Sequence, residues 1–141
     1  LAHVSSTEGL YVAEHIAKLN PKQIDYDCVP ACTYSKPEIG SIGLSQKTLD
    51  ERGINYKIAK SFFNANGKAV ASSSTEGFIK ILVSNDNHIL GAHIIGSNAT
   101  EMISEFSLAM RNNLSVENIL DTIHPHPTFS EAIFETLMQL K

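Results

Sequence analysis

The sequence predicts an α+β fold, in which helices pack on one face of a mostly antiparallel sheet. Two observations support this fold class: strand-like segments fill residues 29–96, and helical apolar patterns fill most of the chain from residue 98 onward. Strands that come before the helices, instead of alternating with them, are typical of α+β layers. With 141 residues, 43% of them hydrophobic, the chain has the size of one domain, which buries about 68–70% of its unfolded surface.

A first helix is predicted at residues 4–19, where apolar side chains recur on one face and Ser6 or Thr7 can cap the start. An Asn-Pro dipeptide ends this helix, because proline cannot continue it. The polar residues 22–26 then have the composition of a linker. We therefore place a domain boundary there, which divides the chain into residues 1–25 and 26–141.

Five strands are predicted from alternating, β-branched or aromatic segments, at residues 29–35, 38–43, 54–63, 77–84 and 89–96. Lys36-Pro37 provides a turn between the first two strands. The last two strands form a hairpin, since the polar residues 85–88 between them have a turn composition. The Gly-, Asn- and Ser-rich residues 64–75 form a connection that is partly helical near Lys68.

Four further helices are predicted, at residues 46–52, 98–112, 116–121 and 129–139. Ser45 caps the first of them, and Gly53 follows it where a left-handed residue is expected. Asn98 and Glu101 have capping-box spacing at the start of the longest helix. Ser115 caps the short helix after it. These helices supply the apolar faces that cover the sheet.

The composition speaks against several classes of partner. The net charge is −4, from 11 basic and 15 acidic residues, and no basic cluster indicates nucleic acid. No apolar run has the roughly 18–20 residues that a membrane span needs. The start has neither the layout of a signal peptide nor an initiator Met, so we expect the chain to be a piece of a longer protein.

The two cysteines, Cys28 and Cys32, have neither the spacing of a C-x-x-C redox motif nor that of half a zinc site. We interpret them as small buried apolar residues near a strand. No two histidines have the spacing of a helical metal site, and we predict no metal. The low cysteine content fits a reducing compartment, and we expect the cytoplasm or, alternatively, the mitochondrial matrix.

Residues 123–131 carry the chemistry that we expect of this chain. Two prolines stiffen the loop around His126, and Glu131 follows five positions later. A histidine can take and give a proton at neutral pH, and a carboxylate on its other ring nitrogen fixes the tautomer. His126 and Glu131 are therefore a candidate acid/base pair.

A structural role for the same residues is also open. Thr128 and Glu131 have the spacing of a capping box, in which the glutamate bonds back to the Thr128 N–H. His124 is either a second candidate base or a packing residue. Of the other histidines, His93 is predicted in the core or on a sheet face, and those at positions 15 and 88 on a helix surface and in a turn.

Five segments, taken together, carry a family resemblance. They are Leu1-Ala2-His3 with Glu8-Gly9, Tyr34-Ser35-Lys36-Pro37-Glu38 with Gly43, Gly77-Phe78-Ile79-Lys80, residues 89–96 and residues 124–131. In this order and spacing they resemble the C-terminal interface, or dimerisation, domain of the flavoprotein disulfide reductases. Within that family, the dihydrolipoamide dehydrogenases match best.

The resemblance implies a homodimeric enzyme that oxidises the dihydrolipoyl groups of 2-oxoacid dehydrogenase complexes. Electrons pass through a disulfide and FAD to NAD in that family. His126 is implied as the acid/base and Glu131 as the residue that orients it, acting on the flavin and disulfide of the other subunit. Leu1, Ala2 and His3 resemble a segment that touches FAD, so residues 1–25 are implied to be the truncated end of the flavin domain.

Some features depart from the family pattern. The family usually has threonine at Ser35, and a small residue other than proline is common at Pro125. The Cys-x4-Cys disulfide and both nucleotide-binding domains are absent, so we expect this chain alone to be inactive and to bind neither FAD nor NAD usefully. The resemblance also suggests a cis His126–Pro127 peptide.

Two alternatives stay open. One is a glutathione reductase-like enzyme, although Phe129-Ser130-Glu131-Ala132 and the preceding His-Pro favour the lipoamide enzymes. The other, from a different class, is a free-standing module that only dimerises.

Overall fold

In the computed structural model, which describes residues 1–141, five strands form one antiparallel sheet in the order β1-β2-β5-β4-β3. The strands are β1 (Ala31–Thr33), β2 (Glu38–Gly43), β3 (Tyr56–Phe62), β4 (Phe78–Ser84) and β5 (Ile89–Gly96). All four strand pairs are antiparallel. The predicted hairpin is confirmed as the β4–β5 pair at the centre of the sheet.

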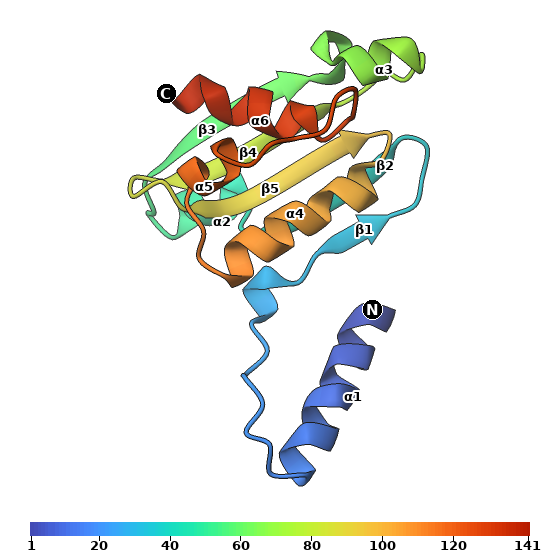
Figure 1. Ribbon diagram of the computed structural model, residues 1–141. Helices are drawn as coiled ribbons and strands as arrows, with labels where there is room; N and C mark the ends of the chain where they lie inside the picture. The colour runs from blue at the N-terminus through green and yellow to red at the C-terminus, as the bar shows by residue number, and fades with distance from the viewer.

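Six α-helices accompany the sheet: α1 (Ala2–Ile16), α2 (Gln46–Glu51), α3 (Gly67–Ala71), α4 (Ala99–Arg111), α5 (Val116–Leu120) and α6 (Glu131–Leu137). Short 3-10 turns occupy Tyr26–Cys28, Phe63–Ala65 and Met138–Leu140. Figure 1 shows α4, α5 and α6 together on one face of the sheet, with α1 standing apart below it. The predicted α+β class is confirmed. None of these helices has the length and apolar character that crossing a bilayer requires.

The core lies between the sheet and these three helices. The register aligns Ala59, Ile81, Ala92 and Ile42 in one row across four strands, and all four are buried. Residues that face one another across strands share a face of the sheet, so this row forms one apolar surface. The helices cover it with buried side chains that include Met102, Ile103, Phe106, Ile133 and Leu137.

The opposite face of the sheet is open over much of its area. Phe62, Phe78, Lys60 and Lys80 share this face, and Phe62 is 55% exposed. The Lys60 ammonium lies 4.2 Å from the centre of the Phe78 ring, which is the geometry of a cation–π contact. One wet and one buried face agree with the alternation that predicted these strands.

Helix α4 lies close against β2 because Gly40 has no side chain. A Cβ at this position would lie 2.5 Å from the Ala99 carbonyl oxygen, closer than any van der Waals contact. Any larger residue at position 40 would push the start of α4 away from the sheet. Gly40 therefore sets the distance between the sheet and helix α4.

The prediction for the first helix is wrong in its bounds and its cap. The helix begins at Ala2, and no side chain caps it. The Thr7 hydroxyl donates to the His3 carbonyl instead, one turn back inside the helix. The helix ends at Ile16, four residues before the Asn-Pro dipeptide, and Lys18 has a left-handed φ of 60°. No residue of α1 is buried, so the apolar face of this helix is exposed to solvent.

The predicted capping box at the longest helix is also wrong. Asn98 is left-handed, with φ 62°, and its side chain makes no cap bond. The Glu38 carboxylate from β2 accepts hydrogen bonds from both the N–H and the hydroxyl of Thr100 instead, at 3.1 and 2.7 Å. A carboxylate at a helix N-terminus satisfies free N–H groups and complements the helix dipole. The cap thus comes from a residue that is distant in sequence.

Other predicted elements change mainly in length. The first strand shrinks to Ala31–Thr33 at the sheet edge, and the last helix begins two residues late, at Glu131, and ends in a 3-10 turn. Ser45 caps α2 as predicted, by accepting from the Thr48 N–H, and Gly53 has the expected positive φ. The connection at residues 64–75 contains α3, as predicted near Lys68.

Replacement of Phe106 by alanine is expected to destabilise the fold by about 3–5 kcal/mol, because it empties a fully buried aromatic site. Leu108→Ala on the same helix is the matched control. Leu108 is 63% exposed, and its loss is expected to change the free energy of unfolding by at most about 0.5 kcal/mol. Urea denaturation of both variants measures the difference, and equal effects would contradict this description of the core.

Candidate active site

The loop between α5 and α6 is held in place by hydrogen bonds at several points. The Thr122 hydroxyl donates to the Asn118 carbonyl at 2.8 Å, and the Thr128 hydroxyl donates to the Pro125 carbonyl at 2.7 Å. The Asn66 amide, at the start of α3, donates to the Thr128 carbonyl at 3.1 Å. These bonds fix the two ends of the loop and leave its middle to project outward.

His126 and Glu131 meet at the end of this loop, as the sequence predicted. His126 Nδ1 lies 2.7 Å from Glu131 Oε1, while the imidazole side chain stays 78% exposed. The Thr128 N–H donates to the other oxygen, Oε2, at 2.8 Å. One carboxylate therefore makes both contacts that the sequence had presented as alternatives. The residue at the helix cap itself is Ser130, and the Thr128 hydroxyl is turned to Pro125.

The surroundings of Glu131 keep its carboxyl group ionised. The backbone N–H of Thr128, and after it the bond from His126, hold the pKa of Glu131 below its ordinary value. An ionised carboxylate can only accept hydrogen bonds, so the proton between the two groups resides on His126 Nδ1. The Nε2 atom of the same ring is then the basic one. The arrangement can take a proton from a group that approaches the exposed edge of His126.

The His126–Pro127 peptide is cis, which confirms the expectation from the sequence. A second cis peptide, Lys36–Pro37, lies in the turn after β1 and was not predicted.

His124, the alternative base, is a packing residue in this structure. Its side chain is only 7% exposed, and Nε2 lies 2.9 Å from Glu105 Oε1 on α4. Its other ring nitrogen faces the Thr122 carbonyl at 3.1 Å. Sequence reasoning missed Glu105, because a contact across 19 positions between a helix and a loop leaves no local pattern.

The remaining histidines lie where the sequence predicted, apart from a more enclosed His88. His93 is half-buried on the open sheet face, with Nε2 3.2 Å from the Leu44 carbonyl, and burial lowers its pKa. His15 is exposed on α1, while His88 pairs with Ser115 through an isolated bridge. No three His, Cys, Asp or Glu side chains lie close enough together to hold a metal ion.

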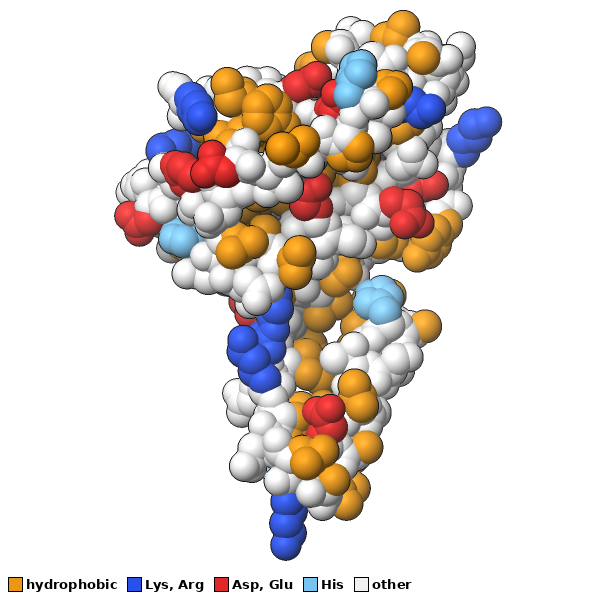
Figure 2. Space-filling model, in the orientation of Figure 1, with side chains coloured by type: hydrophobic (Ala, Val, Ile, Leu, Met, Phe, Trp, Pro, Cys, Tyr) orange, Lys and Arg blue, Asp and Glu red, His pale blue; other side chains and the backbone are white.

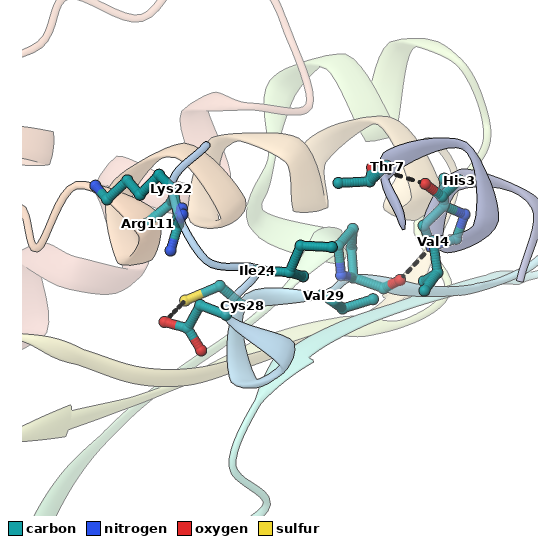
Figure 3. A pocket seen from close by; sticks show the side chains of 10 residues that line it. His3, Val4, Thr7, Lys22, Ile24, Cys28, Val29 and Arg111 are labelled. Atoms are coloured by element: carbon teal, nitrogen blue, oxygen red, sulfur yellow. Dashed lines mark hydrogen bonds between the residues drawn. The ribbon is translucent and has the colours of Figure 1, made fainter. Parts of the chain in front are cut away.

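Of the three residues implied to touch FAD, His3 lines a pocket between α1 and the rest of the chain (Figure 3). The pocket has a volume of about 360 Å³. Its wall includes His3, whose Nε2 is bonded to the Pro30 carbonyl at 2.9 Å, and Arg111. Leu1 is 69% exposed, and no glycine-rich loop that could cradle phosphates is present in the chain.

The two cysteines are free thiols. The sequence predicted buried residues, but both cysteines are only half-buried. The Cys28 thiol donates to the Asp25 carboxylate at 3.3 Å. A dashed line from the Cys28 sulfur marks this bond in Figure 3. Burial, and then this hydrogen bond, raise the pKa of Cys28 to about 11. Burial also raises the pKa of Cys32. Neither thiol has the lowered pKa that makes a cysteine reactive.

Comparison with protein families gives a match over most of the chain. The model of the pyridine nucleotide-disulphide oxidoreductase dimerisation domain matches residues 29–137. The dihydrolipoyl dehydrogenase of Bacillus subtilis is 46% identical over 139 residues, which are 98% of this chain and 29% of that protein. The mitochondrial dihydrolipoyl dehydrogenase of Caenorhabditis elegans is 44% identical over 136 residues, 96% of this chain and 27% of that protein.

Solved structures give the same fold. LpdA from Mycobacterium tuberculosis superposes on 100% of this chain and 31% of its own with a TM-score of 0.94, at 24% identity. The HOCl-induced flavoprotein disulfide reductase RclA from Escherichia coli gives a TM-score of 0.82 over 92% of this chain and 30% of its own, at 23% identity. The chain thus spans less than a third of the length of each of these proteins.

The lowered pKa of Glu131 predicts how its mutation depends on pH. A carboxyl group with a lowered folded-state pKa stabilises the fold above its ordinary value of 4.5, and this contribution is lost as the pH falls through the lowered pKa. Glu131→Gln is therefore expected to lower the urea midpoint at neutral pH and to change it little in strong acid. Glu135→Gln is the contrast, because burial and then Glu131 raise the pKa of Glu135. Its replacement is expected to raise the midpoint at neutral pH, and equal pH profiles would contradict both assignments.

The raised pKa of Cys28 predicts slow alkylation. The thiolate is the reactive form, and a pKa of about 11 instead of 9.0 leaves about 100-fold less of it near neutral pH. Iodoacetamide labelling of Cys28 in a Cys32→Ser variant, followed by mass spectrometry, is expected to be slower by that factor than labelling in urea. The same rate in folded and unfolded protein would contradict the prediction.

Proposed function

Since the chain belongs to the pyridine nucleotide-disulphide oxidoreductase dimerisation domain family, we propose that it is the dimerisation domain of a dihydrolipoyl dehydrogenase. The complete enzyme is a homodimer that oxidises the dihydrolipoyl groups of 2-oxoacid dehydrogenase complexes. Electrons pass through a disulfide and FAD to NAD, all held by parts outside this chain. The relatives named above, dihydrolipoyl dehydrogenases at 46% and 44% identity, support this assignment.

One observation carries the mechanistic part of the proposal. Glu131 accepts from Thr128 with one oxygen and from His126 Nδ1 with the other, at 2.8 and 2.7 Å. This fixes the tautomer and leaves Nε2 of His126 as a base at the surface. The thiolate is the nucleophile in thiol–disulfide exchange, and a dithiol with an ordinary pKa of about 8–9 needs a base at neutral pH. His126 takes the proton of the attacking thiol, and Glu131 stabilises the imidazolium that forms.

The exposure of His126 supports action on another part of the assembly. Its side chain is 78% exposed on a loop that projects from the domain. A base in this position is open to a reacting group that another chain or domain presents. We assign that group to the partner subunit, so the isolated chain is inactive.

The alternatives have less support. A glutathione reductase-like enzyme shares the chemistry, but the relatives named above are dihydrolipoyl dehydrogenases. A module that only dimerises does not account for the His126–Glu131 contact. The compartment that we propose is the cytoplasm. The mitochondrial matrix is the alternative, because relatives with a mitochondrial name match 96% of this chain.

His126→Gln in the complete enzyme is expected to lower kcat for dihydrolipoamide oxidation by about 10²–10⁴-fold, the usual contribution of a general base. The KM is expected to change much less, because the base acts in the reaction step. His15→Gln serves as the control, since His15 is exposed on α1 away from the loop. Steady-state kinetics measures both variants. An unchanged kcat in His126→Gln would overturn the proposed function.

A further inference from the structure

A second histidine–carboxylate contact lies behind the exposed one. His124 is two residues before His126, but its side chain points inward and is only 7% exposed. Nε2 lies 2.9 Å from Glu105 Oε1, and Nδ1 lies 3.1 Å from the Thr122 carbonyl oxygen. An ionised carboxylate and a carbonyl both only accept hydrogen bonds. Both acceptors therefore lie within hydrogen-bond distance of a ring nitrogen of His124, and the tautomer decides which nitrogen donates.

This contact connects three parts of the fold. Glu105 belongs to α4, whose neighbouring residue Phe106 is fully buried against the sheet. The His124 ring also packs against the Phe134 ring of α6, with centroids 6.2 Å apart. The bond to Thr122 ties the ring to the loop itself. His124 therefore fixes the loop to the rigid helix layer immediately before the residues that project.

The other end of the exposed stretch is fixed independently. Thr128 is held by the Asn66 amide and by the Glu131 carboxylate. Between the anchors at His124 and Thr128 only three residues remain. The position of the His126 ring then depends on both anchors, and the first of them depends on Glu105.

The charges around His124 agree with this arrangement. Asp121, Glu131 and Glu135 line the same groove of about 410 Å³ as His124. After the Thr128 N–H and the His126 bond, His124 also contributes to the lowered pKa of Glu131. Carboxylates from the end of α5 and from α6 thus line the groove beside the His124 ring, and Glu105 of α4 is the one that the ring contacts directly.

We propose that Glu105 is a positioning residue for the His126–Glu131 pair and that it acts through His124. This inference rests on the proposed function for its biological meaning. Its structural content is that the Glu105–His124 bond holds the loop in the shape that lets His126 Nδ1 donate to Glu131. Glu105 itself touches neither member of the pair through any hydrogen bond.

The test reads the tautomer of His126 in this chain by ¹⁵N NMR of labelled histidine, without any turnover. The unchanged chain is expected to show His126 protonated at Nδ1. Glu105→Ala is expected to shift the ratio of the Nδ1–H to the Nε2–H form by about tenfold toward the latter, as when one charge-assisted hydrogen bond is weakened. Glu105→Gln keeps an acceptor for His124 Nε2–H and is expected to restore most of the original ratio.

Two further variants make the result decisive. Glu101→Ala removes the same charge from an exposed position one turn earlier on α4, where the side chain makes no hydrogen bond, and is expected to leave the His126 ratio unchanged. Glu105→Asp keeps the charge but shortens the reach, and it carries the test if Glu105→Ala does not fold. An unchanged His126 ratio in folded Glu105→Ala, or in Glu105→Asp, overturns the proposal.

The outcome is separable from that of the proposed function. In the complete enzyme, Glu105→Ala is expected to lower kcat with little change in KM, and Glu105→Gln to retain most of kcat. If His126→Gln leaves kcat unchanged, the proposed function fails, whatever the NMR result. If His126→Gln lowers kcat but the ratio of His126 tautomers is unchanged in the Glu105 variants, only the positioning role of Glu105 fails.

Discussion

The apolar face of the five-stranded sheet must be covered, and the helices after β5 provide most of that cover. Its central row, from Ala59 to Ile42, presents small and branched side chains with no polar group, so leaving it in water is costly. Helices α4, α5 and α6 therefore return across that face one after another (Figure 1). Their connections must then run along the edge of the helix layer. The loop with His126 is the connection between the last two helices, so its exposed position follows from how the sheet is buried.

Two side chains of the site, Glu131 and His124, each make more than one contact. Glu131 completes a turn at the start of α6 and orients His126 with the same carboxylate. His124 fills a space between α4 and α6 and anchors the same loop. Structural and chemical roles are therefore not alternatives here. A carboxylate has two oxygens and an imidazole has two nitrogens, so each side chain can make two contacts at once. Glu131 contacts Thr128 and His126, and His124 contacts Thr122 and Glu105.

One apolar region, helix α1, remains outside the core. Helix α1 has no buried residue, and Leu10 and Ile16 are 61% and 75% exposed. Figure 2 shows apolar side chains gathered over this helix, below the body of the chain. The relatives are more than three times as long as the stretch that matches this chain, since the match covers 29% and 27% of them. An uncovered apolar helix agrees with the expectation from the sequence that residues 1–25 belong to the end of another domain.

Local patterns determined much of this protein. The hairpin of β4 and β5, the cap at Ser45 and the His126–Glu131 contact all follow from residues within a few positions of one another, where turn chemistry and backbone reach are decisive. The family also followed from the order and spacing of motifs. The tertiary structure alone decided what depends on distant partners. Glu38 caps α4 in place of Asn98, and the buried His124 meets Glu105. A hydrogen bond between residues 19 or 62 positions apart is set by the packing of helices on the sheet, which no local pattern records.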